Sequence, residues 1–413
     1  MSGAGSGGIP ARFYRVSSTG SGMVVLDLVE EPLINVAVVD GELAGPEVCV
    51  SSRAVLVEEA ASGELRGRPL EPLTLVDGGL CFDPQDGGVR TRENRLARGA
   101  FNALVAEATR FGMVNAFVHA RRAAHFVNQL LADLGAPPLP SLKVVVGAHS
   151  GSRLPGFGQG DGDFRSGRLR PFSGGHYRLS RITSGVPELV PVAPTGEIHL
   201  GPSRNRKPFA GEPSYLRNAA HNPAIIYHEY GHHLCRHTAD FRLNGERRPA
   251  AQRNGKTGIE EGVCDYLAAS LIGTGQPYGW YGRAGRRLDM EGERHPGDGV
   301  QADAHAIGAR WAALWWQCRR RLVDRDLLPS GLAHDRVVIA ALLEVAQVAR
   351  RGRGDRRRRR EREAQRCAPA TMVDAYLGAL KSAAGSSATR VAEHVLRRVG
   401  RLSSEPVAEE LPC

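Results

Sequence analysis

The spacing of apolar and polar residues divides the chain into a first part rich in strands and a second part rich in helices. Over roughly the first 95 residues, short apolar stretches such as "GMVVLDLV" and "RAVLVEE" alternate with Gly, Pro and Asp, a pattern typical of strands. From Glu93 to Gly135, apolar residues recur every three to four positions, which predicts one long helix or two. We therefore expect a β-rich N-terminal module followed by a helical segment.

Strand-like patterns return before a second helical region begins. The stretches "LKVVVGAHSG" (142–151), "HYRLSR" and "GEIHLGP" favour strands, and residues 151–175 favour a long loop. After Pro223, which suits the first turn of a helix, the run "AIIYHEYGHHLCRH" has helical spacing. Helical patterns dominate from about residue 259, so we predict an α+β protein whose two halves meet near residue 240.

Composition is that of an ordinary globular protein. With 413 residues, 42% of them hydrophobic, the chain can bury a sizeable core. No apolar run approaches the roughly 20 residues that span a bilayer, and the first residues lack the pattern of a secretory signal. We therefore expect no membrane span, and a location that is either cytoplasmic or reached by a non-classical export route. The seven cysteines form no C-x-x-C pair and no dense framework, which favours reduced, mostly buried thiols.

The net charge of +10 raises the alternative of a basic nucleic-acid-binding protein. Much of the excess lies in "ARRGRGDRRRRRERE" (349–363), and arginine-rich segments can bind phosphates by releasing counterions. We favour the other interpretation, in which residues 350–366 form a solvated, disordered insertion between helices. The run "NGKT" (254–257) is no phosphate loop, because Ala250 stands where the first glycine is required.

The feature that carries chemistry is His228-Glu229-x-x-His232. On a helix the two histidines lie on one face, one turn apart, and can present two imidazole nitrogens to a single metal ion. Glu229 projects about 100° around the helix from His228, close enough to act as a general base without binding the metal. The motif alone is moderately specific.

A catalytic zinc usually has a third protein ligand, which spacing can locate. The metzincin pattern requires Gly and His three and six residues after His232, but Cys235 and Thr238 stand there. The alternative is a glutamate on a second helix, where "GIEEGVCDYLAAS" (258–270) offers two.

Of these two glutamates, spacing favours Glu261, because Asp265 lies four residues later on the same helical face, whereas the same offset from Glu260 reaches Cys264. A neighbouring carboxylate can accept the second N–H of a coordinating histidine. We therefore predict Glu261 as the third ligand and Asp265 as the carboxylate that supports a ligand histidine.

Three ordered blocks, "HEYGHHL", "EEGVCDYLAA" and "DAHAIGARWAALWW" (303–316), resemble the thermolysin-like gluzincin metallopeptidases, most closely the fungalysin branch. They cover about 90 residues, from His228 to Trp316. The resemblance implies zinc ligands at the two motif histidines and the downstream glutamate, a general base at the motif glutamate, and an oxyanion-binding histidine at His305. The chain departs from the pattern at Ala304 and Ala309, and residues 1–92 lack a recognisable propeptide and signal.

The resemblance also implies a two-lobed catalytic region. Residues 1–92 then form the N-terminal β-rich module, and residues 93–240 form a β-containing N-lobe that ends in the zinc-binding helix. Residues 241–400 form a helical C-lobe, and residues 401–413 a tail. Such an enzyme is a zinc-dependent endopeptidase acting on a protein or peptide substrate, which is held by an edge strand at 174–180 or 196–201.

Two other interpretations stay open beside the enzyme. The first is an inactive relative that keeps the fold and serves as a scaffold or binding protein. The second is the nucleic-acid binder described above. Several residues near the motifs are expected only to pack or to face solvent: His233, His237, Cys264, Trp311, Trp315 and Trp316.

Overall fold

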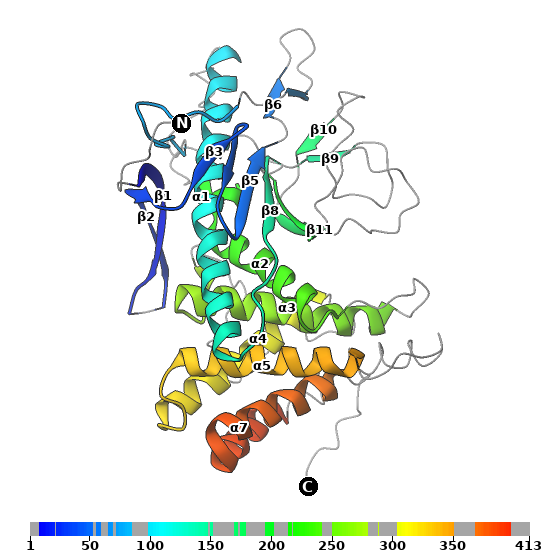
Figure 1. Cartoon of the computed structure of the whole chain (residues 1–413). Helices are drawn as coiled ribbons and strands as arrows, with labels where there is room; N and C mark the ends of the chain where they lie inside the picture. Colours follow the sequence, from blue (N-terminus) through cyan, green and yellow to red (C-terminus); the bar gives the residue numbers. More distant parts are fainter. Residues whose placement is uncertain are drawn as a thin grey trace. The chain divides into compact units, whose positions relative to one another are not determined.

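The computed structural model of this chain contains both helices and strands (Figure 1). The structure describes residues 8–20, 22–52, 55–58, 65–68, 72–84, 98–147, 149–151, 169–171, 174–178, 195–201, 214–216, 218–241, 250–279, 288, 304–350 and 368–397. The arginine-rich segment, the tail and most of the loop expected at 151–175 lie outside these residues. Among the helices described, none is both long and apolar enough to cross a membrane.

Strands form where the alternating pattern predicts them in the first half of the chain. β1 and β2 pair with one another, as do β6 and β7, and β9 pairs with β10. The strands are β1 (Ile9–Ser18), β2 (Val24–Leu33), β3 (Ala37–Val39), β4 (Glu42–Ala44), β5 (Val48–Ser52), β6 (Val55–Glu58), β7 (Leu65–Arg68), β8 (Leu142–Val146), β9 (His149–Gly151), β10 (Leu169–Pro171), β11 (Gly175–Arg178) and β12 (Glu197–Leu200).

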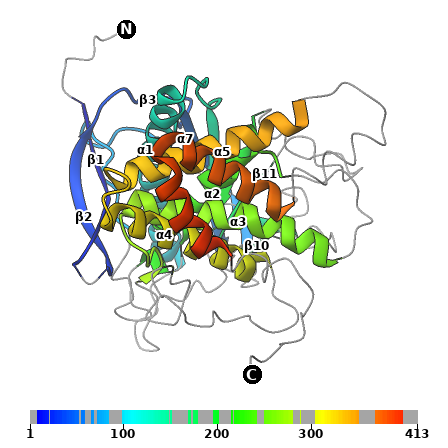
Figure 2. The ribbon, with the colours of Figure 1, turned by 90° about the horizontal axis from the view of Figure 1, so that it is seen from below.

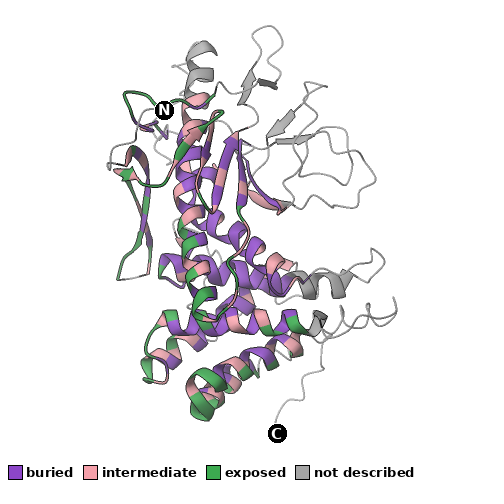
Figure 3. Cartoon of the chain, viewed as in Figure 1, coloured by how far each residue is buried: buried purple, intermediate pink, exposed green. Residues whose placement is uncertain are grey.

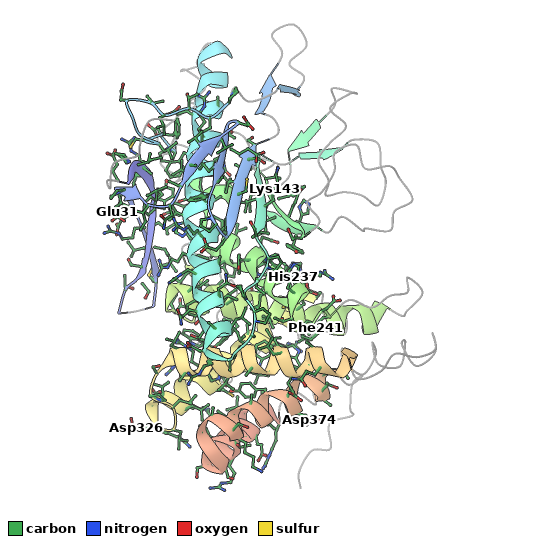
Figure 4. The ribbon with its side chains drawn as sticks, viewed as in Figure 1. Glu31, Lys143, His237, Phe241, Asp326 and Asp374 are labelled. Atoms are coloured by element: carbon green, nitrogen blue, oxygen red, sulfur yellow. The ribbon has the colours of Figure 1, made fainter. Side chains whose placement is uncertain are left out.

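The largest sheet has six strands in the order β11-β12-β8-β5-β4-β3. β8 pairs in parallel with both β5 and β12, and its central residues are buried (Figure 3). β11 pairs antiparallel with β12 and ends the row of described strands. Lys143 on β8 forms an ion pair with Glu42 on β4, with 3.2 Å between Nζ and Oε1 (Figure 4).

This sheet differs from the prediction that residues 1–92 form a module of their own. β3, β4 and β5 belong to that range, yet they share the sheet with β8, β11 and β12. The physical reason is the parallel pairing of β5 with β8, which needs a long crossover, and α1 (Arg98–Asp133) supplies it. Such pairing between distant strands leaves no mark in the local alternation of residues.

The helices follow the predicted segments closely. α1 is a single helix rather than two, and the chain turns at Gly135, whose φ of 68° suits glycine. The remaining α-helices are α2 (Pro223–His237), α3 (Ala250–Ile272), α4 (Ala304–Asp324), α5 (Gly331–Arg350) and α7 (Pro369–Leu396), with short 3-10 helices η1 (Ser214–Leu216) and η2 (Ala219–His221) before α2. Residues 254–257 lie inside α3, in agreement with the rejection of a phosphate loop there.

Contacts group the chain into two compact units. The first unit comprises residues 1–17, 25–125 and 140–230, and it contains the six-stranded sheet. Within it the ring of Phe117 on α1 lies where a side chain on Gly45 would be, 2.9 Å from an added Cβ, so the helix packs closely on the loop after β4.

The second unit comprises residues 18–24, 126–139 and 231–413. Apart from residues 18–24 its described elements are helices, with α3 packed on α4 and α7 packed along α5 (Figure 2). Trp311, Trp315 and Trp316 of α4 are buried, which confirms the prediction that they are packing residues.

Candidate metal centre

The start of α2 is fixed by its sequence. The side-chain Oδ1 of Asn222 accepts hydrogen bonds from the backbone N–H groups of Ala224 and Ile225, at 3.0 and 3.4 Å, and caps the helix. Pro223 occupies the first helical position, where its missing N–H costs nothing. The helix then runs unbroken through the motif, so His228 and His232 lie on one face, one turn apart.

α3 crosses α2 at close range beside this motif. A Cβ atom added to Gly231 would lie 2.6 Å from Cys264 Cα and 2.9 Å from its Sγ, so only glycine lets the two backbones approach. The crossing brings the polar turn of α3 to His232. That turn carries Glu260, Glu261, Cys264 and Asp265 in a single helix, as the sequence predicts.

Three side chains offer metal-binding atoms at this crossing. One ligand atom each from His228, His232 and Cys264 lies within 4.8 Å of the other two. The Oε1 atom of Glu261, the predicted third ligand, lies 3.7 Å from His232 Nε2. The sequence prediction treats Cys264 as a small buried residue only; it is fully buried, but it is also a candidate ligand, which no motif indicated.

His232 has a carboxylate partner on its other nitrogen. Its Nδ1 lies 3.0 Å from Oε1 of Glu260, and the Glu260 side chain is 10% exposed. The sequence prediction assigns the support of a ligand histidine to Asp265 and gives Glu260 no role. Asp265 is fully buried and accepts a hydrogen bond of 3.0 Å from the Tyr278 hydroxyl, and its support of a histidine stays a prediction.

The predicted oxyanion residue His305 is the second residue of α4 and lies beside the third-ligand candidate. Its Nε2 is 3.7 Å from Oε2 of Glu261, while 53% of its side chain is exposed. Gly308, one turn later, allows this approach, since a Cβ there would lie 2.4 Å from the Cβ of Glu261. The close packing of α3 on α4 therefore positions both side chains.

Glu229 is buried next to the edge strand β11. A Cβ on Gly175 of that strand would lie 2.6 Å from Glu229 Cγ and 2.8 Å from its Oε1. The glutamate is 5% exposed. Of the two strands predicted as substrate-binding strands, β11 is at the end of the described sheet, whereas β12 lies between β11 and β8. Of these two strands, therefore, only β11 has an edge that pairs with no other described strand.

The thiols near the site are protonated in this environment. Burial raises the pKa of Cys264 well above its ordinary value, and a hydrogen bond with Cys235 raises it further. Burial also raises the pKa of Cys235. A metal ion that binds Cys264 must therefore displace a tightly held proton.

Comparison with known proteins adds no relative to these observations. No model of a protein family and no curated protein sequence matches this chain. The assignment of the site therefore depends on its residues.

The donor set fits a zinc ion. Two imidazoles with a carboxylate or a thiolate are the ligands that zinc takes in proteins, and tetrahedral bonds of about 2.0–2.3 Å separate such donors by about 3.3–3.8 Å. The donors of His228, His232 and Cys264 lie within 4.8 Å of one another, and Oε1 of Glu261 lies 3.7 Å from His232 Nε2, which is close to that spacing. The site is also rich in buried carboxylates, whose burial without a cation is costly. These carboxylates are Glu229, Glu260, Glu261 and Asp265.

The other histidines of α2 lie outside the donor set. His233 is fully buried, and its ring packs edge-on against His237 with 4.5 Å between ring centroids. His237 is the last residue of the helix (Figure 4). The sequence predicts that both residues either pack or face solvent, and their ring contact corresponds to the first of these roles.

Proposed function

We propose that this chain is a zinc-dependent endopeptidase of the thermolysin-like gluzincin type, with that family's two-lobed fold. One observation carries the proposal. The histidines of α2 gather with donors of α3, and a buried glutamate follows the first histidine directly. This is the arrangement that metal-assisted hydrolysis requires, since it supplies ligands and a proton acceptor together.

His228, His232 and Glu261 would hold the zinc ion in this proposal. The zinc ion, when bound, supplies Lewis acidity, which polarises a peptide carbonyl and lowers the pKa of water from about 15.7 to about 7. Glu260 keeps the imidazole of His232 oriented through its 3.0 Å contact with Nδ1.

Glu229 is the proton acceptor. As general base it takes a proton from the attacking water and then passes it to the leaving amine. Its burial keeps bulk water away from the carboxylate, and the β11 backbone at Gly175 limits the positions that the side chain can take. His305 is exposed enough to reach a substrate and would donate a hydrogen bond to the developing oxyanion.

The substrate would be an extended peptide. β11 presents a strand edge, and a peptide in β conformation can pair with such an edge through its main chain, whatever its side chains are. Because Gly175 brings β11 against Glu229, a peptide paired there passes close to the proton acceptor. This supports hydrolysis of an internal peptide bond in an extended substrate rather than hydrolysis of a small ester.

The test is peptide hydrolysis by Glu229→Gln. This substitution keeps the size of the side chain but removes the base, so we expect a fall in kcat of about 10³-fold with bound zinc unchanged. Hydrolysis of a fluorogenic peptide library and elemental analysis measure the two quantities. Glu393→Gln on α7 serves as the matched control and should keep wild-type activity. Equal activity of Glu229→Gln and the wild type would refute the assignment.

The position of Cys264 favours a second candidate function, a structural zinc site in a scaffold protein. If Cys264 joins His228, His232 and Glu261, the zinc has four protein ligands and no open position for water, as in structural sites. Comparing Cys264→Ala with Glu261→Ala decides between the two. An enzyme loses zinc with Glu261→Ala and keeps it with Cys264→Ala. A closed structural site loses zinc in both variants and hydrolyses no peptide.

A further inference from the structure

A hollow lined by basic side chains lies in the second unit. It has a volume of about 510 Å³ and is formed by the end of α4 and the last part of α7. None of its seven lining residues is acidic, and four carry or can carry positive charge. The lining residues are Arg321, Arg325, Leu327, Ser387, Arg390, Val391 and His394.

Hydrogen bonds at a helix end order the backbone on one side of this hollow. α4 ends in a turn in which the N–H groups of Leu327 and Leu328 both bond to the carbonyl of Leu322, at 2.8 and 3.1 Å. Asp326 adopts a φ of 55° in this turn, between Arg325 and Leu327 (Figure 4). The lining residues at and after the end of α4 thus project from a hydrogen-bonded turn.

The opposite wall comes from the part of α7 that follows a kink. Gly385 has φ 77° and ψ −174° and interrupts the helix, so Ser387 and Arg390 lie in the first turns of a new helical segment. The Arg390 Nη2 donates a hydrogen bond of 3.1 Å to Ser387 Oγ. This contact holds the guanidinium on the wall of the hollow.

Favourable interaction with a helix dipole explains the position of only some of these basic side chains. Arg321 and Arg325 lie at the C-terminal end of α4, where positive charge offsets the helix dipole. Arg390 follows a helix start, where the dipole disfavours a positive charge. A bound anion would interact favourably with all of these positive groups.

We propose that this cavity binds a small phosphorylated ligand. Arginine guanidinium groups bind phosphate oxygens in pairs of charge-assisted hydrogen bonds, and three of them line the cavity. Leu327 and Val391 provide an apolar wall for the rest of the ligand. The volume is within the range of about 300–1,000 Å³ that small-molecule sites have, which suits a ligand of nucleotide size.

The experiment measures binding of inorganic pyrophosphate, ADP and adenosine by calorimetry at physiological salt. We expect pyrophosphate and ADP to bind and adenosine not to bind. Arg325→Glu and Arg390→Glu should each weaken binding at least about tenfold, because each removes a phosphate contact and adds repulsion. Both side chains are exposed, so the variants should fold, and their thermal unfolding checks this.

Arg320→Glu is the matched control. Arg320 is exposed on the same helix, next to Arg321, but does not line the cavity, so the same change of charge should alter affinity less than about twofold. His228→Ala should also leave the affinity unchanged, which separates this site from the metal centre. The proposal is refuted if pyrophosphate and ADP fail to bind, or if Arg320→Glu weakens binding as much as Arg325→Glu. Binding of a single-stranded oligonucleotide alone, with the same dependence on arginine, would also refute it.

Discussion

Glu260 and Glu261 are adjacent in α3, yet they lie next to different nitrogens of the same imidazole. Glu260 contacts Nδ1 of His232 at 3.0 Å, and Glu261 lies 3.7 Å from Nε2. When Nδ1 donates its proton to Glu260, the lone pair of Nε2 points toward Glu261 and is ready for a metal ion. In the proposed site, one carboxylate would therefore set the tautomer and the other would share the ion.

At the residue scale, Glu260→Ala should therefore weaken zinc binding. Loss of such an orienting partner typically reduces metal affinity about 10- to 100-fold, and we expect a change within this range. Glu260→Gln keeps an acceptor for Nδ1–H but loses the charge, and should have a smaller effect. Competition with a chromophoric chelator measures both affinities. Unchanged affinity in Glu260→Ala would mean that the contact with His232 does not orient a ligand.

A second histidine, away from the metal centre, is held neutral by its surroundings. His334 on α5 is fully buried; its Nδ1 lies 2.6 Å from the Tyr266 hydroxyl and its Nε2 lies 2.7 Å from the Tyr376 hydroxyl. Burial, together with the nearby positive charge of Arg319, lowers the pKa of His334 to about 3. In the folded state His334 therefore stays neutral at mildly acidic pH and does not take up a second ring proton.

The pH dependence of stability follows from this shift. The unfolded chain binds a proton at His334 near its ordinary pKa of about 6.5, so the stability is fully present above that pH and is lost as the pH falls toward 3. Between pH 7.5 and pH 5 the loss should be about 2 kcal/mol from this residue. His334→Gln removes this titration. When the pH is lowered from 7.5 to 5, the Tm of the variant, measured by calorimetry, should therefore fall less than the Tm of the wild type. An equal fall would contradict the prediction.

At the scale of elements, glycines determine how closely α3 approaches its neighbours. A Cβ on Gly262 would lie 2.5 Å from the Cβ of Trp311, and one on Gly308 would lie 2.4 Å from the Cβ of Glu261. These contacts hold α3 and α4 at backbone distance, and they lie directly beside the third-ligand candidate. The packing of two helices and the position of one ligand thus depend on the same small residues.

Gly308→Ala should disturb both stability and metal binding. The added methyl group must displace Glu261 or separate the helices, which costs about 1–3 kcal/mol and moves a ligand. We expect a lower Tm and weaker zinc binding. Gly378→Ala on α7 is the matched control, because nothing lies within 4 Å of its added Cβ; it should be neutral or stabilising by up to about 1 kcal/mol. Wild-type behaviour of Gly308→Ala would show that α3 tolerates the shift.

At the scale of the whole molecule, zinc should stabilise the fold as well as serve chemistry. The proposed ligands come from two helices that are separate in sequence, so the unfolded chain does not form the site. Free zinc at about 1,000 times its Kd adds about 4 kcal/mol to stability. Zinc should therefore raise the Tm and a chelator should lower it. His228→Ala should lose this response, and a Tm that does not depend on zinc would argue against a bound ion.

The sequence determined the elements and the core of the candidate site. Strands, helix boundaries and the burial of the three tryptophans of α4 follow from local periodicity, because each element must bury one face whatever its partners are. The position of the two motif histidines on one face follows from helix geometry alone. The assignments of Glu261 and His305 depend on spacing and on family resemblance, and the experiments above test them.

Only the tertiary structure decided which elements meet. The parallel pairing of β5 with β8, which joins the N-terminal strands to the later sheet, has no local signature. The approach of Cys264 and Glu260 to the histidines depends on Gly231, which leaves room for α3. Nothing in the local sequence of α2 indicates that a second helix packs at this glycine. Local sequence sets which face of an element is apolar, but the contacts between distant elements arise from packing, and the approach of Cys264 and Glu260 to the histidines is such a contact.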